Sequence, residues 1–186
     1  MEKNDLLFEK TLSHKEIFNG RVLHVFEDQV ELPNKHTSSR EIIEHPGGVC
    51  IAALTENNEL LLVKQFRYPY KEVILEVPAG KLEKNQTPLE NGIRELEEET
   101  GAIGENFISL GEMYPSPGYS SEILYMFFCN VKEIKKTNFD VDEFLEIHTI
   151  PLEKCVEMVL NNEIHDAKSQ LVILKTYYML KNKKLI

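Results

Sequence analysis

The chain has 186 residues, enough for one domain of ordinary size with a small appended sheet but cramped for two full domains. Hydrophobic residues make up 42% and charged residues 28%, a balance typical of globular proteins. The formal net charge of −10 argues against a general nucleic-acid binder, which neutralises phosphates with Lys and Arg. No apolar run approaches the roughly 20 residues that a membrane-spanning helix needs, so we expect no membrane partner.

The N-terminus and the cysteines indicate the compartment. The first residues, MEKNDLLFEKTL, include acidic side chains and lack the basic start and apolar stretch of a secretory signal, so we expect a cytoplasmic protein. Cys50, Cys129 and Cys155 lie far apart, without CxxC spacing and among apolar neighbours. This pattern predicts buried thiols and argues against metal ligands or disulfides.

The first half of the chain is predicted to be rich in strands. Residues 21–31 alternate apolar and polar positions up to the turn signal Pro33-Asn34, and residues 40–44 follow as a second strand. After a loop that contains Gly47 and Gly48, two apolar segments joined by a polar tip predict a buried hairpin, and one more strand comes next. These three segments are residues 49–54, 60–65 and 73–77.

One helix is marked at both ends, over residues 88–100. Thr87 is the candidate N-cap, and Pro88 occupies the first helical position. Glu90 completes a capping box, and Gly101 supplies the C-terminal stop. We therefore expect both ends of this helix where these residues stand.

Beyond this helix the sequence predicts further strands and two more helices. An acidic segment, residues 139–146, precedes the last of these strands. The strands are predicted at residues 109–114, at residues 123–131 and near Ile147, and the helices at residues 152–161 and 167–181. The order of elements predicts an α+β (α/β) fold, a mixed sheet covered by helices. We distinguish an N-terminal β region, residues 1–45, from a main domain, residues 46–186.

Three glutamates share one face of the capped helix. Glu95, Glu98 and Glu99 are three and four residues apart, so at about 100° per residue they occupy an arc of roughly 100°. Like charges at this spacing destabilise an isolated helix by a few tenths of a kcal/mol, and a bound divalent cation would compensate. A solvated acidic face is the ordinary alternative. The apolar side chains on another arc, which we expect to pack on the sheet, are Leu89, Ile93 and Leu96.

The pattern around this helix resembles the Nudix box, which reads Gly, five residues, Glu, seven residues, Arg-Glu-U-x-Glu-Glu-x-Gly-U, with U a bulky aliphatic. Gly80 is followed after five residues by Gln86 and after seven more by RELEEETGA, which starts at Arg94. Two positions depart from the pattern, because Gln86 replaces the first glutamate and Ala102 is a small final aliphatic. Gln86 can accept a hydrogen bond but carries no charge, which leaves its effect on metal affinity open.

The resemblance implies the Nudix fold, a mixed β-sheet sandwiched between helices with a small N-terminal β-sheet region. It also implies a pyrophosphohydrolase that depends on Mg²⁺, for which Mn²⁺ can substitute. By this resemblance Glu95 and Glu99 are the principal metal ligands and the carbonyl of Ala79 is a further one. Glu98 would be a ligand or a supporting catalytic carboxylate, and Arg94 would orient the glutamates.

Beyond the box the chain is similar to the ADP-ribose pyrophosphatases, over residues 17–168. Pro117 lies 16 residues past Gly101, where a proline marks this subgroup. Ser-Pro-Gly alone is an ordinary turn, but with the box and this spacing we favour a binding role. The loop that would hold the terminal ribose across a dimer interface comprises Ser116, Pro117, Gly118 and Glu122.

Further substrate contacts are implied before the box. The guanidinium groups of Arg40 and Arg67 suit a pyrophosphate by their charge and fork geometry, although isolated arginines are more often surface charges. An unpaired buried carboxylate is costly, so Glu76, within an apolar strand, either pairs with an arginine or faces the site. By the resemblance, Arg21, Val22 and His45 lie near the adenine of the substrate. Val22 is a poor stacking group for adenine, and His45 is equally well explained as an ordinary loop histidine. The implied contacts are Arg21, Val22, Arg40, Glu41, His45, Arg67 and Glu76.

The general base is implied in the acidic segment before the last predicted strand, where relatives carry a glutamate on a mobile loop. Glu143 is the first choice and Asp142 the second, and a solvated loop is the alternative. The base would take a proton from the attacking water while metal ions neutralise the pyrophosphate charge. The products from ADP-ribose would be AMP and ribose 5-phosphate.

Two other functions stay open at this point. One is hydrolysis of another ADP-sugar, a sugar nucleotide or an oxidised nucleotide. The other is a non-catalytic module that senses ADP-ribose or NAD derivatives, which the retained glutamates and the absence of a basic helix-turn-helix disfavour. The partners we expect are a small-molecule substrate and a second copy of the chain, since the N-terminal strands are too few for a free-standing sheet.

Overall fold

The computed structural model describes residues 6–137 and 144–182. The chain forms two compact units. Unit 1 comprises residues 1–46 and 114–123, and unit 2 comprises residues 47–113 and 124–186. Among the described residues, no helix is both long and apolar enough to cross a membrane.

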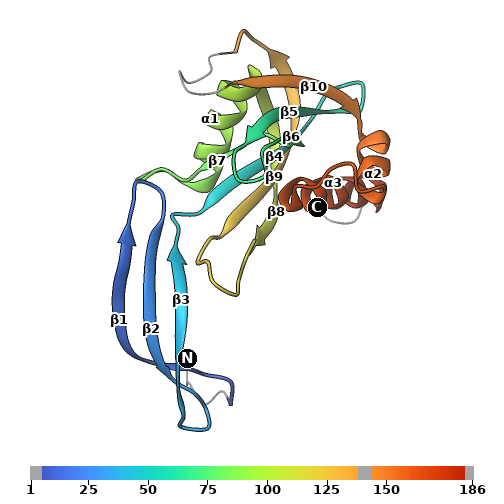
Figure 1. Ribbon diagram of the computed structural model, residues 1–186. Coiled ribbons are helices and arrows are strands. Elements are labelled where there is room, and N and C mark those ends of the chain that lie inside the picture. The colour runs from blue at the N-terminus through green and yellow to red at the C-terminus, as the bar shows by residue number, and fades with distance from the viewer. Residues whose placement is uncertain (1–5, 138–143, 183–186) are drawn as a thin grey trace. The chain divides into compact units, whose positions relative to one another are not determined.

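Unit 1 contains a three-stranded antiparallel sheet in the order β1-β2-β3. Its strands are β1 (Lys10–Asn19), β2 (His24–Glu31) and β3 (Thr37–Glu44) (Figure 1). The sequence pattern did not predict the whole of β1. Every residue of this strand is exposed, and its apolar side chains do not alternate with polar ones, so the usual period of two is missing.

Unit 2 is built on a seven-stranded mixed sheet. The main path runs β10-β5-β4-β9-β8, while β6 pairs with β5 and β7 pairs with β4. β4 and β9 are parallel, and the other pairs are antiparallel. The strands are β4 (Gly48–Leu54), β5 (Glu59–Arg67), β6 (Glu72–Glu76), β7 (Ala79–Lys81), β8 (Ala102–Met113), β9 (Leu124–Ile134) and β10 (Leu145–Pro151).

The predicted hairpin of β4 and β5 is confirmed only at its tip. Leu54 and Leu60 are register partners, and no further pair of these two strands is formed. Instead, β7 pairs with residues 48–50 of β4, and β6 pairs with residues 63–67 of β5. Residues 77 and 78, which join β6 to β7, therefore lie where the two halves of the predicted hairpin separate.

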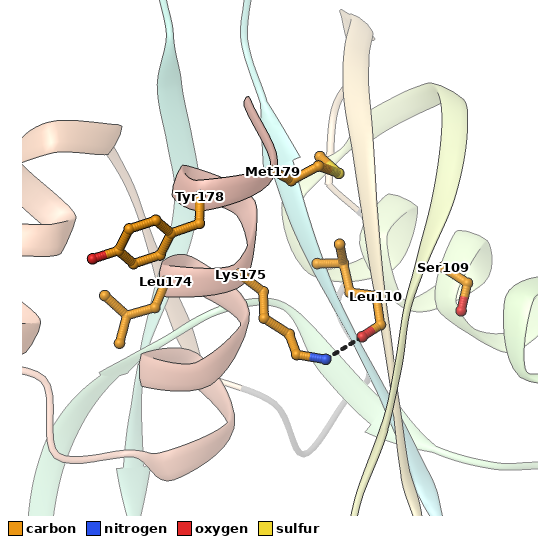
Figure 2. Close-up of a pocket in the computed structure, with 6 residues that line it drawn as sticks. All are labelled: Ser109, Leu110, Leu174, Lys175, Tyr178 and Met179. Carbon is orange, nitrogen blue, oxygen red and sulfur yellow. Dashed lines mark hydrogen bonds between the residues drawn. The ribbon is translucent and has the colours of Figure 1, made fainter. Parts of the chain in front are cut away.

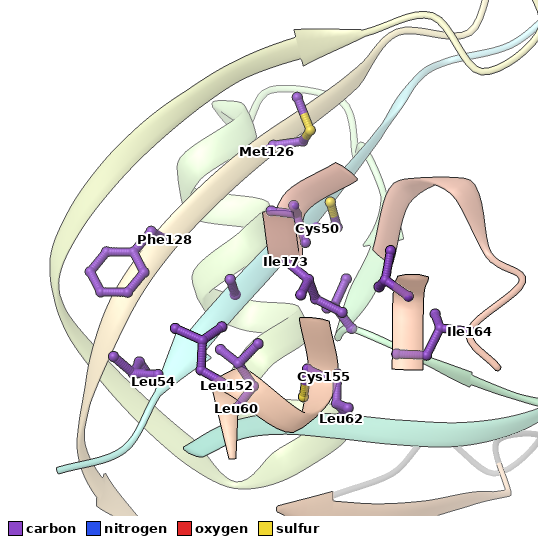
Figure 3. Close-up of a cluster of buried hydrophobic side chains, with 14 of the residues drawn as sticks. Cys50, Leu54, Leu60, Leu62, Met126, Phe128, Leu152, Cys155, Ile164 and Ile173 are labelled. Atoms are coloured by element: carbon purple, nitrogen blue, oxygen red, sulfur yellow. The ribbon is translucent and has the colours of Figure 1, made fainter. Parts of the chain in front are cut away.

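Residues 6–137 and 144–182 contain the helices α1 (Pro88–Thr100), α2 (Leu152–Leu160) and α3 (Ala167–Asn182), and the sheet lies between them (Figure 1). β4 shows why, because all of its residues are buried and alternate ones belong to different clusters. Cys50 and Leu54 pack in the cluster that includes residues of α2 and α3 (Figure 3). Ile51 packs with Leu96 of α1 on the other face. The predicted mixed sheet between helices is confirmed.

The three cysteines are free and buried, as predicted. Burial raises the pKa of the Cys50, Cys129 and Cys155 thiols to about 12. The thiols are therefore neutral at physiological pH and behave as small apolar groups.

A hollow of about 350 Å³ lies between α3 and β8 (Figure 2). Its lining includes Leu110, Leu174 and Met179. The Lys175 ammonium donates a hydrogen bond to the carbonyl of Leu110 at 2.5 Å, which ties the helix to this edge strand. Of the residues predicted for the functional site, none that the structure describes lines this hollow.

Candidate active site

Helix α1 begins and ends as its sequence predicts. The Thr87 hydroxyl accepts the Glu90 N–H at 3.3 Å, and the Glu90 carboxylate accepts the Thr87 N–H at 2.7 Å. Gly101 adopts a left-handed conformation with φ of 71°, and its N–H donates to the carbonyl of Glu97. The capping box and the glycine stop hold the acidic face of the helix in a defined position.

The buried face of α1 differs from the predicted apolar stripe. Leu96 is buried, but Ile93 is 39% exposed, and the carboxylate residue Glu99 is only 4% exposed. The helix approaches the sheet closely through Gly92, where an added Cβ would lie 2.9 Å from Val49 Cγ2. This approach turns Glu99 inward. The expectation that all three glutamates lie on an open acidic face is wrong for Glu99.

Glu95 and Glu99 both meet the segment that joins β6 to α1. The Ala79 N–H donates to Glu99 Oε2 at 3.0 Å. An added Cβ at Gly80 would collide with the carboxylate of Glu95, so only glycine lets this side chain lie against the main chain. The structure thus brings together Ala79, Glu95 and Glu99, which the sequence predicted as a set.

Arg94 holds two of the α1 glutamates. Its guanidinium donates to Glu98 Oε2 at 2.6 Å and to Glu95 Oε1 at 2.8 Å, and it lies 3.3 Å from Glu83 Oε1. Partial burial lowers the pKa of Arg94, but the three carboxylates more than offset this and raise it. We refer to these four residues as the α1 network: Glu83, Arg94, Glu95 and Glu98.

The donor set fits a hard divalent cation in kind. Glu95, Glu98 and Glu99 supply carboxylate oxygens and Ala79 can supply a main-chain carbonyl, which are the ligands that Mg²⁺ prefers. In residues 6–137 and 144–182, no three Asp, Glu, His or Cys side chains are already gathered as a metal cluster. Arg94 holds two of these carboxylates and the Ala79 N–H holds the third. A cation would have to compete with these contacts.

Glu76 pairs with an arginine, one of the two arrangements left open by the sequence. This residue is only 2% exposed, and its carboxylate accepts from Arg67 Nε at 2.6 Å and from Arg67 Nη2 at 2.7 Å. Lys168 from α3 binds the same carboxylate and also lies 2.9 Å from Asp166. Burial by itself raises the pKa of Glu76, but Arg67 and Lys168 together bring it below its usual value. We call Arg67, Glu76, Asp166 and Lys168 the buried network.

Arg67 connects this network electrostatically to the site. Its hydrogen bond with Glu76 raises its pKa most, and the charges of Asp166 and Glu99 raise it further. The side chain is 39% exposed. Its guanidinium is therefore within electrostatic range of the inward-facing glutamate while still reaching solvent.

Sequence reasoning missed several polar residues around the site. Asn91 is fully buried, and its side chain accepts the Glu83 N–H at 2.9 Å and donates to the Thr87 carbonyl at 2.9 Å, which folds the loop back onto α1. A polar residue beside the apolar positions of a well-capped helix was the available signal. The others lie at the start of α3 and are Asp166, Lys168 and Ser169. Only Asp166 carries a signal in the sequence, because aspartate is a common N-cap residue and this one accepts the Ser169 N–H.

The predicted substrate residues of unit 1 fall into separate places. The loop 114–123 is tied to the end of β3, because the Ile43 N–H donates to the Tyr119 carbonyl and the Ser121 N–H donates back to the Ile43 carbonyl. This places His45 Nδ1 3.6 Å from Glu122 Oε1. Two of the predicted residues are therefore neighbours within unit 1.

The remaining unit 1 residues show no common cluster. Ser116 closes a turn by accepting the Ser120 N–H at 2.9 Å, with Pro117 and Gly118 exposed at its tip. Arg40 is held by Glu9 at 2.6 and 2.9 Å. The other three, which lie outside these contacts, are Arg21 and Val22 in the bend between β1 and β2, and exposed Glu41 on β3.

The predicted base lies outside the described residues. Glu143 and the second choice, Asp142, both fall in the gap between residues 137 and 144. Their role stays a prediction.

Comparisons with known proteins identify the family of the chain. The model of the family described as NUDIX domain matches residues 44–171. An ADP-ribose pyrophosphatase from Bacillus subtilis (strain 168) is 40% identical over 169 residues, covering 90% of this chain and 91% of that protein. A methanol dehydrogenase activator from Bacillus methanolicus is 38% identical over 170 residues, covering 90% and 92%. A solved structure of an ADP compounds hydrolase has a TM-score of 0.86 at 17% identity, covering 99% and 100%, which shows a shared fold. The chain belongs to the Nudix hydrolase family.

Proposed function

We propose that this Nudix hydrolase cleaves the pyrophosphate of ADP-ribose to AMP and ribose 5-phosphate, with Mg²⁺ as its cofactor and Mn²⁺ as a substitute. The observation that carries the chemistry is the meeting of Glu95 and Glu99 with Ala79 and Gly80. The substrate is supported by the 40% identity to an ADP-ribose pyrophosphatase over 90% of the chain.

In this proposal, different residues bind the cation and the pyrophosphate. Glu95, Glu99 and the Ala79 carbonyl bind the cation, with Glu98 as a further ligand or support. Bound there, Mg²⁺ supplies neutralisation of the phosphate charge and a lowered pKa for the attacking water. Arg67 adds a fixed positive charge for the pyrophosphate, because its guanidinium is oriented by Glu76 and partly exposed.

An activity assay with a set of nucleoside-diphosphate compounds tests this proposal. The purified protein is incubated with ADP-ribose, other ADP-sugars, a sugar nucleotide and an oxidised nucleotide, with Mg²⁺ or with a chelator, and the products are separated by chromatography. We expect ADP-ribose to give the highest kcat/KM and to yield AMP and ribose 5-phosphate only with metal. A higher kcat/KM for another compound would reassign the substrate. Tight binding of ADP-ribose without turnover would support a sensor.

We place the general base at Glu143. Glu143→Gln is expected to lower turnover by about 100- to 10,000-fold while Mg²⁺ and ADP-ribose still bind, because a positioned acid-base group acts on the chemical step. Single-turnover assays and binding titrations separate the two effects. A larger loss in Asp142→Asn would move the base to Asp142, and normal turnover in both variants would leave metal activation or Glu98.

We propose that the active species is a cytoplasmic homodimer formed through the N-terminal β region, residues 1–45. Leu12, Ile17 and Phe18 of β1 are exposed apolar side chains, which is the kind of surface that a second copy can cover. The free, buried cysteines suit a reducing compartment. Sedimentation and assay at the same nanomolar concentrations test the dimer, and full activity of a monomer would refute it.

A further inference from the structure

The segment of residues 77–79, just before Gly80, is held by three different elements through consecutive residues. The Val77 N–H donates to Ser169 Oγ of α3 at 2.9 Å. The Pro78 carbonyl accepts the Ile51 N–H of β4 at 3.0 Å. The Ala79 N–H donates to Glu99 of α1 at 3.0 Å. The three consecutive residues that lead to the Ala79 carbonyl are therefore each hydrogen-bonded to a different element.

The Ser169 hydroxyl has a defined orientation. A main-chain N–H can only donate, so the hydroxyl accepts from Val77 and must send its own proton elsewhere. That proton goes to Asp166 Oδ2 at 2.5 Å, and the same oxygen accepts the Ser169 N–H at 2.9 Å. Ser169 is fully buried, so water does not reach its hydroxyl.

The charges behind this contact are balanced. Asp166 lies 2.9 Å from Lys168, which also binds Glu76. Glu76 immediately precedes Val77, so the chain is anchored at two consecutive residues by the first turn of α3. Arg67 also binds Glu76, so two cations neutralise two carboxylates. Such a network has no excess negative charge with which to bind a metal ion. Ser169 itself is uncharged, so its effect on the site has to come through the position of the segment that it holds.

We infer that Ser169, oriented by Asp166, is a positioning residue that sets where the Ala79 carbonyl and Glu99 meet the divalent cation. This inference rests on the proposed function. Metal sites depend on residues that hold the ligands, and their loss typically lowers metal affinity or activity by about 10- to 100-fold. Here the positioning group comes from the C-terminal helix, 92 residues from the segment that it holds.

Thr176 provides a matched control on the same helix. It is fully buried like Ser169, but its hydroxyl has no hydrogen-bond partner among the described residues. Thr176→Val and Ser169→Ala each remove one buried hydroxyl from α3. A purely structural role for Ser169 predicts that the two variants differ in stability at most, whereas a positioning role predicts that they differ in metal binding.

The test measures Mn²⁺ affinity in the full-length protein without substrate, by titration with electron paramagnetic resonance of free Mn²⁺, alongside thermal unfolding. For Ser169→Ala we expect the Mn²⁺ Kd to rise by about 10-fold. For Thr176→Val we expect a change below about 2-fold. Asp166→Ala leaves the hydroxyl in place but removes its orientation, so it should weaken Mn²⁺ binding in the same direction and serves if Ser169→Ala does not fold.

The Glu99→Gln variant distinguishes a failure of the positioning role from a failure of the metal site. If it loses Mn²⁺ affinity while Ser169→Ala and Asp166→Ala match Thr176→Val, the positioning role is refuted and the metal site stands. If Glu99→Gln binds Mn²⁺ like the wild type, the metal site of the proposed function itself is refuted. A selective loss in Ser169→Ala, with Thr176→Val unchanged, supports the inference.

Discussion

The α1 network and the buried network adjoin the same short segment but differ in charge balance and exposure. In the α1 network one guanidinium faces three carboxylates, and the side chains of Glu83, Glu95 and Glu98 are 56%, 14% and 33% exposed. In the buried network two cations face two carboxylates around Glu76, which is 2% exposed. The first retains excess negative charge that a divalent cation can balance, while the second is already neutral.

This difference indicates a division of roles. A balanced, buried set of ions is costly to break, because removing one partner leaves an uncompensated charge away from water. A partly exposed set contributes little to stability, because water and salt screen it. We therefore expect loss of a charge in the buried network to lower stability most, and loss of a ligand charge on α1 to lower activity with little loss of stability.

Removal of the Glu76 charge tests the buried network. Glu76→Gln should lower the free energy of unfolding by about 3–5 kcal/mol, since Arg67 and Lys168 lose their shared counter-charge. Urea unfolding at neutral pH measures the loss. Glu157→Gln is the control, because the pair of Lys154 and Glu157 on α2 is exposed, and its loss should stay within about 0.5 kcal/mol. Equal effects in both variants would contradict the contrast.

The same carboxylate predicts a pH dependence. Although burial raises the pKa of Glu76, Arg67 and Lys168 hold it below the ordinary value of 4.5 in the folded state. A group with a lowered folded pKa stabilises the fold fully above its unfolded pKa and ceases to do so as pH falls through the folded one. Between about pH 6 and about pH 3, unfolding experiments should show a steeper loss of stability in the wild type than in Glu76→Gln. If stability fell equally with pH in the wild type and in Glu76→Gln, Glu76 would not contribute to this pH dependence.

The next largest effect concerns catalysis. Glu99→Gln should lower turnover by at least about 100-fold with the fold intact, because it removes a charged metal ligand and the amide oxygen can still accept the Ala79 N–H. Steady-state kinetics at saturating Mg²⁺ provide the measurement. Glu97→Gln, on the exposed side of the same helix, is the matched control and should stay within about 2-fold of the wild type. Near-normal turnover in Glu99→Gln would remove it from the ligand set.

Arg94 tests the α1 network, where we expect only a small change in stability. Arg94→Gln should change the free energy of unfolding by about 1 kcal/mol or less, because its ion pairs are partly exposed and screened. Urea unfolding in low and high salt measures the change. A loss of stability as large as that of Glu76→Gln would show that the two networks contribute equally to stability and would contradict the contrast between them.

Several features of the site were predictable from the sequence because they depend on neighbours only a few residues away. Thr87, Glu90 and Gly101 mark the ends of α1 through contacts within one helical turn. The spacing from Gly80 to the α1 glutamates likewise identified the family, which the match to the NUDIX domain model confirms. The type of donor, carboxylate and carbonyl oxygen, followed from the same residues.

Other features required the packed chain. The helical period placed Ile93 on the packing stripe and Glu99 on an open face, yet Ile93 is exposed and Glu99 is buried. The reason is that the close approach of Gly92 to Val49 selects which side of α1 meets the sheet. A hydrophobic stripe narrows this choice but does not make it, because the sheet also offers polar main-chain groups such as the Ala79 N–H.

The ends of α1, the family and the chemistry of the donors could be read from the sequence, since cap residues, box spacing and side-chain type are local properties. Only the tertiary structure decided that Glu76 is neutralised by both Arg67 and Lys168, and that Ser169 holds Val77. These contacts join residues up to 92 positions apart. Their energy comes from burial and from low solvent screening, which exist only once the sheet and its helices have packed.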